Sequence, residues 1–222
     1  MCGRFTRRYT WQEVHEGLSL LDGAPNFAAS YNVAPTQSSL IARYDSTAGG
    51  RVAALARWGL LPAWAKDIDV GARAFNARAE TLAERPMFRS AFASRRCLVP
   101  VSEFYEWRKP DRQPFAFGAA GGVVLALAGL WELWTSPAGE TVRSFTIVTT
   151  EANVTMAPIH NRMPVVLAPD AWSAWLGEAT VAPAQLAALL RPCPPEALTM
   201  WPVSRRVGNV REDDPGLVER VA

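Results

Sequence analysis

The residue that follows the initiator methionine offers the most distinctive chemistry in the chain. Cys2 stands between Met1 and Gly3, and because cysteine is small we expect removal of Met1 to leave it as the N-terminus. It would then carry an amine and a thiol on adjacent carbons, with pKa values of roughly 8 and 8.5. The thiol can attack an acyl carbon with the amine as its base, or the amine can condense with an aldehyde and the thiol can close a thiazolidine ring. Most small N-terminal residues have no such role, so the motif needs support from elsewhere in the chain.

A polar segment further along the chain supplies hydrogen-bonding groups. Asn76, Arg78 and Glu80 bring an amide, a guanidinium and a carboxylate together within Asn76–Thr81. On a strand, Arg78 and Glu80 would share a face, where they can form a modest ion pair instead of a site. This segment alone leaves both interpretations open.

Two other segments hold acid–base candidates. Glu103 and Glu106 stand beside aromatic residues just after a predicted strand, and His160 is one of only two histidines. A carboxylate and an imidazole are common general acids and bases. A surface carboxylate and a hydrogen-bonded structural histidine would explain the same residues. These positions therefore become candidates only in combination.

The cysteine and histidine content argues against a metal site and against a disulfide framework. Cys2, Cys97 and Cys193 are odd in number, widely separated and without a C-x-x-C pair, and the histidines are His15 and His160. Structural zinc sites and disulfide-rich domains both need more such residues at closer spacing. We therefore expect no metal, no cofactor and a reducing compartment.

Length and composition are typical of one globular domain. The 222 residues are 49% hydrophobic and 20% charged, their mean hydropathy is −0.01, and a chain of this size can bury a substantial core. The longest charge-free stretch, Gln113–Trp131, contains Pro114 and several glycines. It therefore predicts two buried strands joined by a turn rather than a membrane span. The N-terminal arginines are not followed by an apolar run, which predicts no signal peptide and a cytoplasmic location.

Charge is unevenly distributed along the chain. Residues 1–110 carry 15 Lys or Arg against 10 Asp or Glu, whereas residues 111–222 carry 8 against 11. Of the basic residues, 21 are arginines, which suit bidentate phosphate contacts and stacking on bases. A pI of 8.6 is low for a dedicated nucleic-acid binder, and genome base composition also explains a preference for Arg over Lys. The charge pattern alone leaves nucleic-acid binding and an ordinary solvated surface both open.

Local sequence signals predict an α+β fold in which strands outnumber helices. Thr10 and Glu13 form a potential capping box for a helix over residues 11–21. A glycine-containing turn between two β-rich runs predicts a hairpin, and prolines at first helical positions mark three further helices. Connections made mostly by turns favour a largely antiparallel, curved sheet. The predicted strands cover residues 38–44, 51–58, 96–101, 113–117, 123–133 and 143–150, and the other helices cover residues 86–93, 169–176 and 183–190.

Seven short segments together match the pattern of one protein family. They are Met1–Phe5, Tyr31–Pro35, Trp58–Pro62, Asn76–Thr81, Phe104–Trp107, His160–Pro164 and Trp201–Ser204. In these segments and their order the chain resembles the SRAP (SOS response-associated peptidase) family, which includes bacterial abasic-site shield proteins and a eukaryotic relative. The resemblance implies a single domain over residues 1–222 with a barrel-like core and short flanking helices. Residues from about 209 to 222 are a candidate flexible tail.

The resemblance implies covalent chemistry on damaged DNA. In the family, the cysteine exposed by methionine removal bonds to the ring-opened aldehyde of an abasic site in single-stranded DNA, strand junctions included, and forms a thiazolidine. That cysteine is Cys2 here, and the family's catalytic asparagine, glutamate and histidine correspond to Asn76, Glu106 and His160. The implied protein shields the lesion during replication and the DNA damage response, with lyase-type and self-processing peptidase activity. It is expected to be a monomer that needs no cofactor, metal or membrane.

The resemblance also implies DNA contacts of two kinds. Some lie on phosphates beside the lesion, and others lie against bases, where aromatic side chains stack and apolar side chains wedge. The implied phosphate contacts are Arg4, Arg78 and Arg162, and the remaining contacts are Asn32, Pro35, Trp64 and Met87.

Other functions remain open from the sequence. Met-Cys-Gly also begins the glutamine amidotransferases of the N-terminal nucleophile class, in which the cysteine attacks a carboxamide, but that assignment leaves Glu106 and His160 unexplained. A passive single-stranded DNA-binding module would explain the Arg and Trp content but not a cysteine at position 2. For the peptidase of the family's name, the expected substrate is the chain's own Met1.

Overall fold

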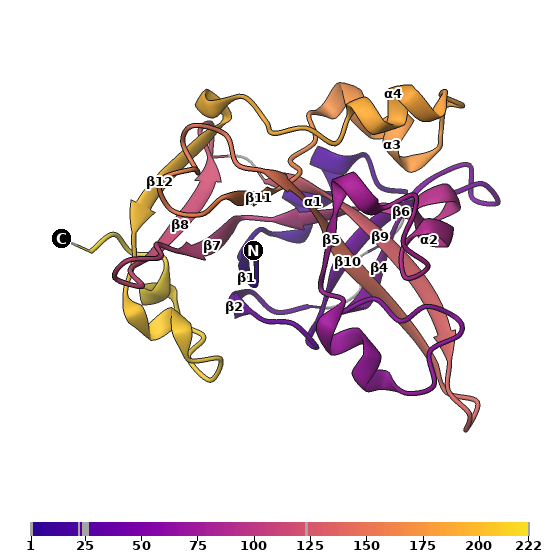
Figure 1. Cartoon of the computed structure of the whole chain (residues 1–222), viewed down its shortest axis with the longest axis horizontal. Coiled ribbons are helices and arrows are strands. Elements are labelled where there is room, and N and C mark those ends of the chain that lie inside the picture. The colour runs from indigo at the N-terminus through magenta and orange to yellow at the C-terminus, as the bar shows by residue number, and fades with distance from the viewer. Residues whose placement is uncertain (1, 22, 24–26, 123, 222) are drawn as a thin grey trace.

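Five strands close into a barrel that forms the core of the structure (Figure 1). The computed structural model describes residues 2–21, 23, 27–122 and 124–221. The barrel strands are β3 (Ser38–Asp45), β4 (Gly50–Trp58), β6 (Arg96–Val101), β9 (Leu125–Thr135) and β10 (Thr141–Glu151). Their order is β10-β4-β3-β6-β9, and a second pairing of β9 with β10 closes the ring. Neighbours are antiparallel except β4 and β10, which run parallel.

Two short strands extend the barrel sheet at the far end of β10. Strand β5 (Asn76–Arg78) pairs in parallel with residues 147–149 of β10, and β11 (Arg162–Pro164) pairs antiparallel with residues 149–151. One end of β10 therefore helps to close the barrel, and the other end carries two of the segments that hold candidate site residues.

A second, antiparallel sheet lies beside the barrel, with its strands in the order β12-β8-β7-β1-β2. These strands are β1 (Arg4–Arg7), β2 (Ser30–Val33), β7 (Glu103–Trp107), β8 (Pro114–Ala119) and β12 (Leu198–Pro202). Only Ser102 separates β6 from β7, so the chain passes directly from the barrel into this sheet. Figure 1 shows β7, β8 and β12 projecting to the left of the barrel.

Alternation along the barrel strands separates two hydrophobic clusters. In β9, Leu125 and Leu127 belong to one cluster, whereas Ala126 and Ala128 belong to the other, because successive side chains of a strand point to opposite faces. The first cluster fills the barrel and continues into β1, β7 and β8, and the second lies between the outer face of the barrel and the helices. The interior is tightly filled: a Cβ added at Gly129 would lie 2.9 Å from the Cys97 sulfur.

Short helices cover the outer face of the barrel. Helix α1 (Trp11–Leu18) begins at the predicted capping box of Thr10 and Glu13, and it ends at Ser19, which adopts a left-handed conformation with φ 53°. The other helices are α2 (Arg89–Ser94), α3 (Trp172–Leu176) and α4 (Pro183–Ala188), with 3₁₀ helices η1 (Ile68–Arg73), η2 (Ala79–Thr81), η3 (Pro169–Ala171), η4 (Pro195–Ala197), η5 (Arg205–Gly208) and η6 (Pro215–Leu217). Within the described residues, no helix has the length and apolar character needed to span a membrane.

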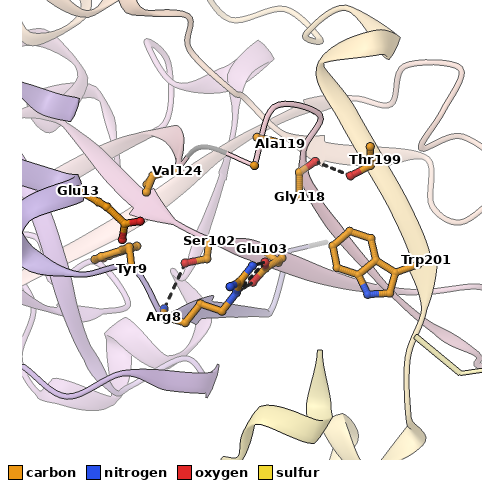
Figure 2. A pocket seen from close by; sticks show the side chains of 11 residues that line it. Arg8, Tyr9, Glu13, Ser102, Glu103, Gly118, Ala119, Val124, Thr199 and Trp201 are labelled. Atoms are coloured by element: carbon orange, nitrogen blue, oxygen red, sulfur yellow. Dashed lines mark hydrogen bonds and ion pairs between the residues drawn. The ribbon is translucent and has the colours of Figure 1, made fainter. Parts of the chain in front are cut away.

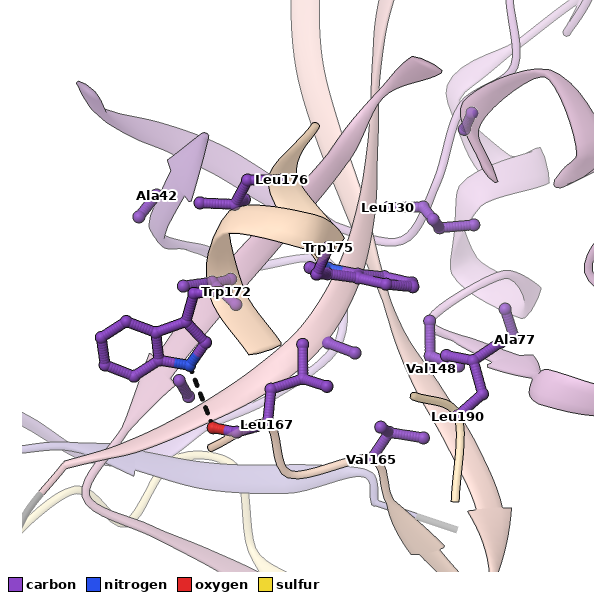
Figure 3. Close-up of a cluster of buried hydrophobic side chains, with 14 of the residues drawn as sticks. Ala42, Ala77, Leu130, Val148, Val165, Leu167, Trp172, Trp175, Leu176 and Leu190 are labelled. Carbon is purple, nitrogen blue, oxygen red and sulfur yellow. Dashed lines mark hydrogen bonds between the residues drawn. The ribbon is translucent and has the colours of Figure 1, made fainter. Parts of the chain in front are cut away.

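Two tryptophans fix helix α3 on the barrel. Trp175 is fully buried and donates a hydrogen bond from Nε1 to the Cys97 carbonyl at 2.8 Å, and Trp172 donates from Nε1 to the Leu167 carbonyl at 3.0 Å. Figure 3 shows both rings among aliphatic side chains, with Leu130 and Val148 contributed by the barrel strands. Because each indole is buried with its N–H satisfied, the rings stabilise the packing without an unpaired polar group.

The α+β class, the single domain core and the barrel-like sheet predicted from the sequence are confirmed. The predicted hairpin is β3 and β4, but the predicted helix over residues 11–21 ends at Leu18 because the chain turns at Ser19. The charge-free stretch does hold two buried strands, β8 and β9, although they belong to different sheets. Residue 123, the predicted start of the second of these strands, lies outside the described residues, as do Met1 and residue 222.

The C-terminal residues pack against the second sheet. Leu217 is fully buried, the Trp201 indole donates to the Val218 carbonyl at 2.8 Å, and Asp213 accepts a hydrogen bond from the backbone N–H of Tyr31. The prediction of a flexible tail from about residue 209 is therefore wrong for residues 209–221. Their sequence is polar, and they are held by the buried Leu217, by backbone contacts and by polar side chains such as Asp213.

Candidate functional site

Cys2 lies two residues before the start of β1 and is buried between the barrel and the second sheet. Its side chain is fully covered and belongs to the cluster that fills the barrel, and its sulfur lies 4.0 Å from the Arg4 carbonyl. Burial raises the pKa of the Cys2 thiol, and the nearby negative charge of Glu106 raises it further. The resting side chain is therefore a neutral thiol rather than a thiolate.

Asn76 contacts the backbone of Cys2 directly. Its Nδ2 donates a hydrogen bond to the Cys2 carbonyl at 2.7 Å. The position of Asn76 is fixed by the preceding residue, because the buried Trp58 donates from Nε1 to the Phe75 carbonyl at 2.8 Å. The other amide atom, Asn76 Oδ1, is buried and has no hydrogen-bond partner within the described part of the chain. It can accept a hydrogen bond from an N–H or O–H group brought to Cys2.

Glu106 supplies a buried carboxylate to the same site. It lies on β7, opposite Phe115 of β8, and its side chain is 4% exposed. Its charge acts on both the Cys2 thiol and the His160 imidazole, and at both groups it raises the pKa. The charge of Glu106 is therefore felt by both groups.

His160 lies between the turn over residues 154–159 and the start of β11. The backbone N–H of His160 donates to the Met156 carbonyl at 3.0 Å, and the N–H of Arg162 donates to His160 Nδ1 at 3.0 Å. The Arg162 carbonyl also lies 3.3 Å from Nδ1, but the shorter contact is the one in which Nδ1 accepts from a backbone N–H, which can only donate. The neutral ring therefore carries its proton on Nε2. Burial lowers the pKa of His160, although Glu106 partly opposes this effect. The imidazole therefore stays neutral at pH 7, with an N–H group to donate.

The four candidate catalytic residues come from four separate segments and meet at one place. Asn76 bonds to Cys2, and Glu106 acts electrostatically on Cys2 and His160. The arrangement combines a thiol with a hydrogen-bonding amide, a carboxylate and a neutral imidazole. Such a set can bind an electrophilic carbon at the cysteine and move protons around it. The catalytic roles remain predictions.

The second carboxylate of the β7 segment belongs to a different part of the molecule. Glu103 and Glu106 are three positions apart on one strand, so their side chains lie on opposite faces. Figure 2 shows Glu103 with Arg8 in a polar pocket of about 310 Å³, which Trp201 and Ser102 also line. Arg8 Nε lies 2.9 Å from Glu103 Oε1, and Thr6 also donates to this carboxylate. Glu103 is thus a paired structural carboxylate.

The three predicted phosphate-binding arginines differ in how they are held. Arg78 is exposed on β5. Arg4 is half-buried, and its guanidinium donates to the carbonyls of Gly3 and Gly208 at 3.3 and 3.4 Å. Burial lowers the pKa of Arg4, although its ordinary value is so high that the group stays charged. Arg162 is engaged by Glu80, a partner that the sequence did not predict.

The predicted base contacts also differ in exposure. Trp64 is 58% exposed, an unusual exposure for a tryptophan, and its ring is available for stacking. Met87 is half-buried and packs against the cluster on the outer face of the barrel, so it presents only part of its side chain. Pro35 is half-buried beside Thr36, whose φ is 77°. Trp64 is the strongest of the three candidates on exposure alone.

Asn32 is buried, and its side chain joins β2 to the C-terminal segment of the chain. It is 2% exposed, and its Nδ2 donates to the carbonyls of Asn209 and Glu212 at 2.9 and 2.8 Å. Because the side chain is buried, it offers no exposed group to a strand in this structure, and the DNA contact of Asn32 stays a prediction. The side chain instead anchors the segment whose Gly208 carbonyl accepts a hydrogen bond from Arg4.

Replacing Asn32 with Ala is expected to lower the free energy of unfolding by about 1–3 kcal/mol, because two backbone carbonyls lose the buried amide that donates to them. Urea unfolding followed by circular dichroism measures this loss. The matched control is Asn161→Ala at an exposed position, which we expect to change the stability by less than about 0.5 kcal/mol. Equal stability of the two variants would contradict the anchoring role of Asn32.

The described residues contain no group of three or more His, Cys, Asp or Glu side chains that could hold a metal ion. The described cysteines are all free and buried. The side chains that converge at Cys2 offer acid–base and hydrogen-bonding groups instead of a ligand set.

Solved structures show the same architecture. A crystal structure of a protein from Bordetella bronchiseptica superposes with a TM-score of 0.79 and 25% identity, covering 91% of this chain and all of that chain. A second, from Bacteroides thetaiotaomicron, has a TM-score of 0.77 at 25% identity, over 86% of this chain and 85% of that chain. The barrel and its attached sheet thus recur in proteins with three quarters of their residues changed.

Sequence comparisons identify the family. The chain is 38% identical to the abasic site processing protein YoqW of Bacillus subtilis, over 99% of both proteins. It is 31% identical to the abasic site processing protein HMCES of Xenopus tropicalis, over 85% of this chain and 65% of that protein. The sequence model of the SOS response associated peptidase family matches residues 1–210. This chain therefore belongs to the SOS response associated peptidase (SRAP) family.

Proposed function

We propose that this protein processes abasic sites by bonding covalently to them in single-stranded DNA, through the amine and thiol of Cys2. Relatives over nearly the whole chain are named abasic site processing proteins. The observation that carries the covalent chemistry is the 2.7 Å hydrogen bond from Asn76 to the Cys2 carbonyl. It holds the reactive residue by its backbone carbonyl, so this bond uses neither the thiol nor the amine that removal of Met1 would release.

The first step is opening of the deoxyribose ring. An abasic sugar is mostly a closed hemiacetal, and its C1′ becomes an aldehyde when the bond from C1′ to the ring oxygen breaks. The ring oxygen then needs a proton, and the hydroxyl on C1′ must lose one. The Nε2–H of neutral His160 suits the donation, and the carboxylate of Glu106 suits the acceptance.

The second step joins the protein to the sugar. The amine of Cys2 adds to the aldehyde carbon, water leaves, and a carbon–nitrogen double bond forms. The sulfur of Cys2 then bonds to the same carbon, and the thiol proton is transferred to the nitrogen, which closes a thiazolidine ring. Because the pKa of the thiol is raised by burial and by Glu106, we expect this proton to pass through Glu106 as the carbon–sulfur bond forms. We propose that Asn76 Oδ1, which is buried and has no partner within the described residues, accepts a hydrogen bond from the amine.

The proposed strand contacts come from segments next to this chemistry. Arg4 and Arg78 lie two residues from Cys2 and from Asn76, respectively, and we infer that their guanidiniums bind phosphates beside the lesion. The exposed ring of Trp64 offers a stacking surface for a base. These contacts recognise a strand without reading its sequence, and we infer that the aldehyde supplies the specificity.

A cross-linking assay tests the proposed function. The protein is incubated with a single-stranded oligonucleotide that holds one abasic site, and adducts that survive denaturant are separated on a gel. The wild-type protein should form the adduct, and an intact oligonucleotide should give none. Cys2→Ala retains an amine but no thiol, so it should give only an imine that hydrolyses. Cys193→Ala removes another buried cysteine and should keep adduct formation.

The same assay separates the alternatives. Binding of the abasic strand without any adduct would overturn the covalent proposal in favour of a passive DNA-binding module. Hydrolysis of glutamine without any adduct would favour an amidotransferase. Mass spectrometry of the purified protein reports whether Met1 has been removed, which the chemistry requires.

A further inference from the structure

An ion pair beside the candidate site occupies the groups with which an arginine binds phosphate. Arg162 donates from Nη1 to Glu80 Oε1 at 2.6 Å and from Nη2 to Glu80 Oε2 at 3.0 Å. This two-pronged geometry is the one in which arginine binds either a carboxylate or a phosphate. The two terminal nitrogens of the guanidinium are therefore already engaged by a carboxylate of the protein itself.

The two partners of this pair are held very differently. Arg162 Nη2 also donates to the Thr149 carbonyl at 2.6 Å, and the arginine side chain is only 15% exposed. The Glu80 side chain is 51% exposed and lies on the short helix η2, directly after β5. The arginine is thus fixed to the end of β10, whereas the glutamate can turn into solvent. An anion that displaces this pair would replace Glu80 and leave Arg162 in place.

The position of Glu80 is also one that a DNA phosphate would favour. Arg162 is its hydrogen-bond partner, and the charge of Arg78 acts on it as well, and both interactions hold the pKa of Glu80 below its ordinary value. The negative charge of Glu80 is therefore stabilised by two arginines, which lie on β5 and β11 two residues after Asn76 and His160, respectively. A phosphate of a strand threaded past Cys2 would meet the same pair of cations.

We propose that Glu80 occupies the position of a DNA phosphate on Arg162 and thereby sets the specificity of the protein for damaged strands. This inference rests on the proposed function. Any strand, intact or damaged, must displace Glu80 before it gains the contact with Arg162, so every non-covalent complex is weakened. Only a strand whose aldehyde reacts with Cys2 is then retained. Glu80 therefore lowers the time spent on intact DNA without lowering the stability of the final adduct.

Glu80→Gln tests this proposal, because it removes the charge and keeps the shape. The dissociation constant for a fluorescently labelled intact oligonucleotide is measured by anisotropy at several salt concentrations. We expect Glu80→Gln to bind about three- to fivefold more tightly than the wild type, as expected for loss of one partly exposed ion pair. The slope of log K against log salt should steepen by about 0.7, the value for one more phosphate contact on a single strand.

The controls separate local competition from a general change in charge. Glu84→Gln removes a charge at an exposed position four residues further on, and we expect it to change the affinity less than Glu80→Gln does. In an Arg162→Gln background, Glu80→Gln should no longer tighten binding, because the proposed competition acts through that arginine. Thermal unfolding of each variant confirms that the fold is retained.

The outcomes are distinct from those of the proposed function. Unchanged or weaker binding of intact DNA by Glu80→Gln would overturn the inference, since it would mean that Glu80 only orients Arg162. The wild-type adduct with the abasic strand would still form in that case, and the proposed function would stand. Absence of a wild-type adduct would instead remove the proposed function, whatever the affinity of Glu80→Gln for intact DNA.

Discussion

Replacing Glu106 with Gln is expected to slow formation of the abasic-site adduct by about 10²- to 10⁴-fold, the usual contribution of a general acid–base group. The amide keeps the size of the side chain but cannot accept the proton of the Cys2 thiol. Because the thiol is buried and its pKa is raised, a solvent base cannot easily replace the carboxylate. Single-turnover cross-linking at saturating protein measures this rate directly.

A matched variant controls for the loss of a buried charge. Glu132 is another buried strand carboxylate, 5% exposed, and it pairs with Arg95 at 2.7 Å. We expect Glu132→Gln to cost stability but to leave the cross-linking rate of the folded protein within about twofold of the wild type. Similar slowing in both variants would mean that Glu106 acts through the fold and not through proton transfer.

The difference between Glu106 and Glu103 shows what the sequence could not provide. Both residues stand beside aromatics in one short segment, and the sequence placed that segment after a strand rather than on one. Once β7 is recognised as a strand, their spacing of three puts them on opposite faces. Glu103 is then hydrogen-bonded to Arg8 and Thr6, whereas the charge of Glu106 acts on Cys2. In a strand of only five residues, the alternation of apolar and polar side chains is too short to be recognised directly after another strand.

The sequence also left the partner of Glu80 open, for a related reason. Two residues apart on a strand, Arg78 and Glu80 would share a face. The strand ends at Arg78, however, and η2 begins at Ala79, so the alternation is interrupted between them. Glu80 is turned toward Arg162, which is 82 residues away in the sequence. Contacts of this range depend on the pairing of β5 and β11 with β10, which no local pattern specifies.

Local signals were sufficient for other parts of the fold. The capping box at Thr10 and the turn between β3 and β4 involve neighbouring residues, and both were predicted correctly. Closure of the barrel requires β4 and β9 to pair with β10, and the register between these strands depends on the packed interior. Sequence reasoning therefore identified strands, a hairpin and reactive residues, whereas the structure supplied the neighbours that give those residues a role.

Among the side chains that pack between the barrel and the candidate site, we expect the indole of Trp58 to contribute most to the free energy of unfolding. It is fully buried, its ring centroid lies 4.8 Å from that of Phe5 and 6.2 Å from that of Phe145, and its Nε1 bonds to the Phe75 carbonyl. Phe5 belongs to β1, which follows Cys2, and Phe75 precedes Asn76. The ring therefore packs between the two segments that bring Cys2 and Asn76 together.

Trp58→Ala should lower the free energy of unfolding by about 3–5 kcal/mol, because it removes a large core side chain and leaves a cavity. For a chain of this length, that loss corresponds to a fall in melting temperature of about 6–20 °C, measured by circular dichroism. Trp64→Ala, six residues further on, removes an exposed ring and should change the melting temperature little while weakening the binding of single-stranded DNA. The two variants separate stability from recognition within one segment. If Trp64→Ala destabilised the protein as much as Trp58→Ala, Trp64 would be a structural residue, and its assignment as a stacking surface would have to be withdrawn.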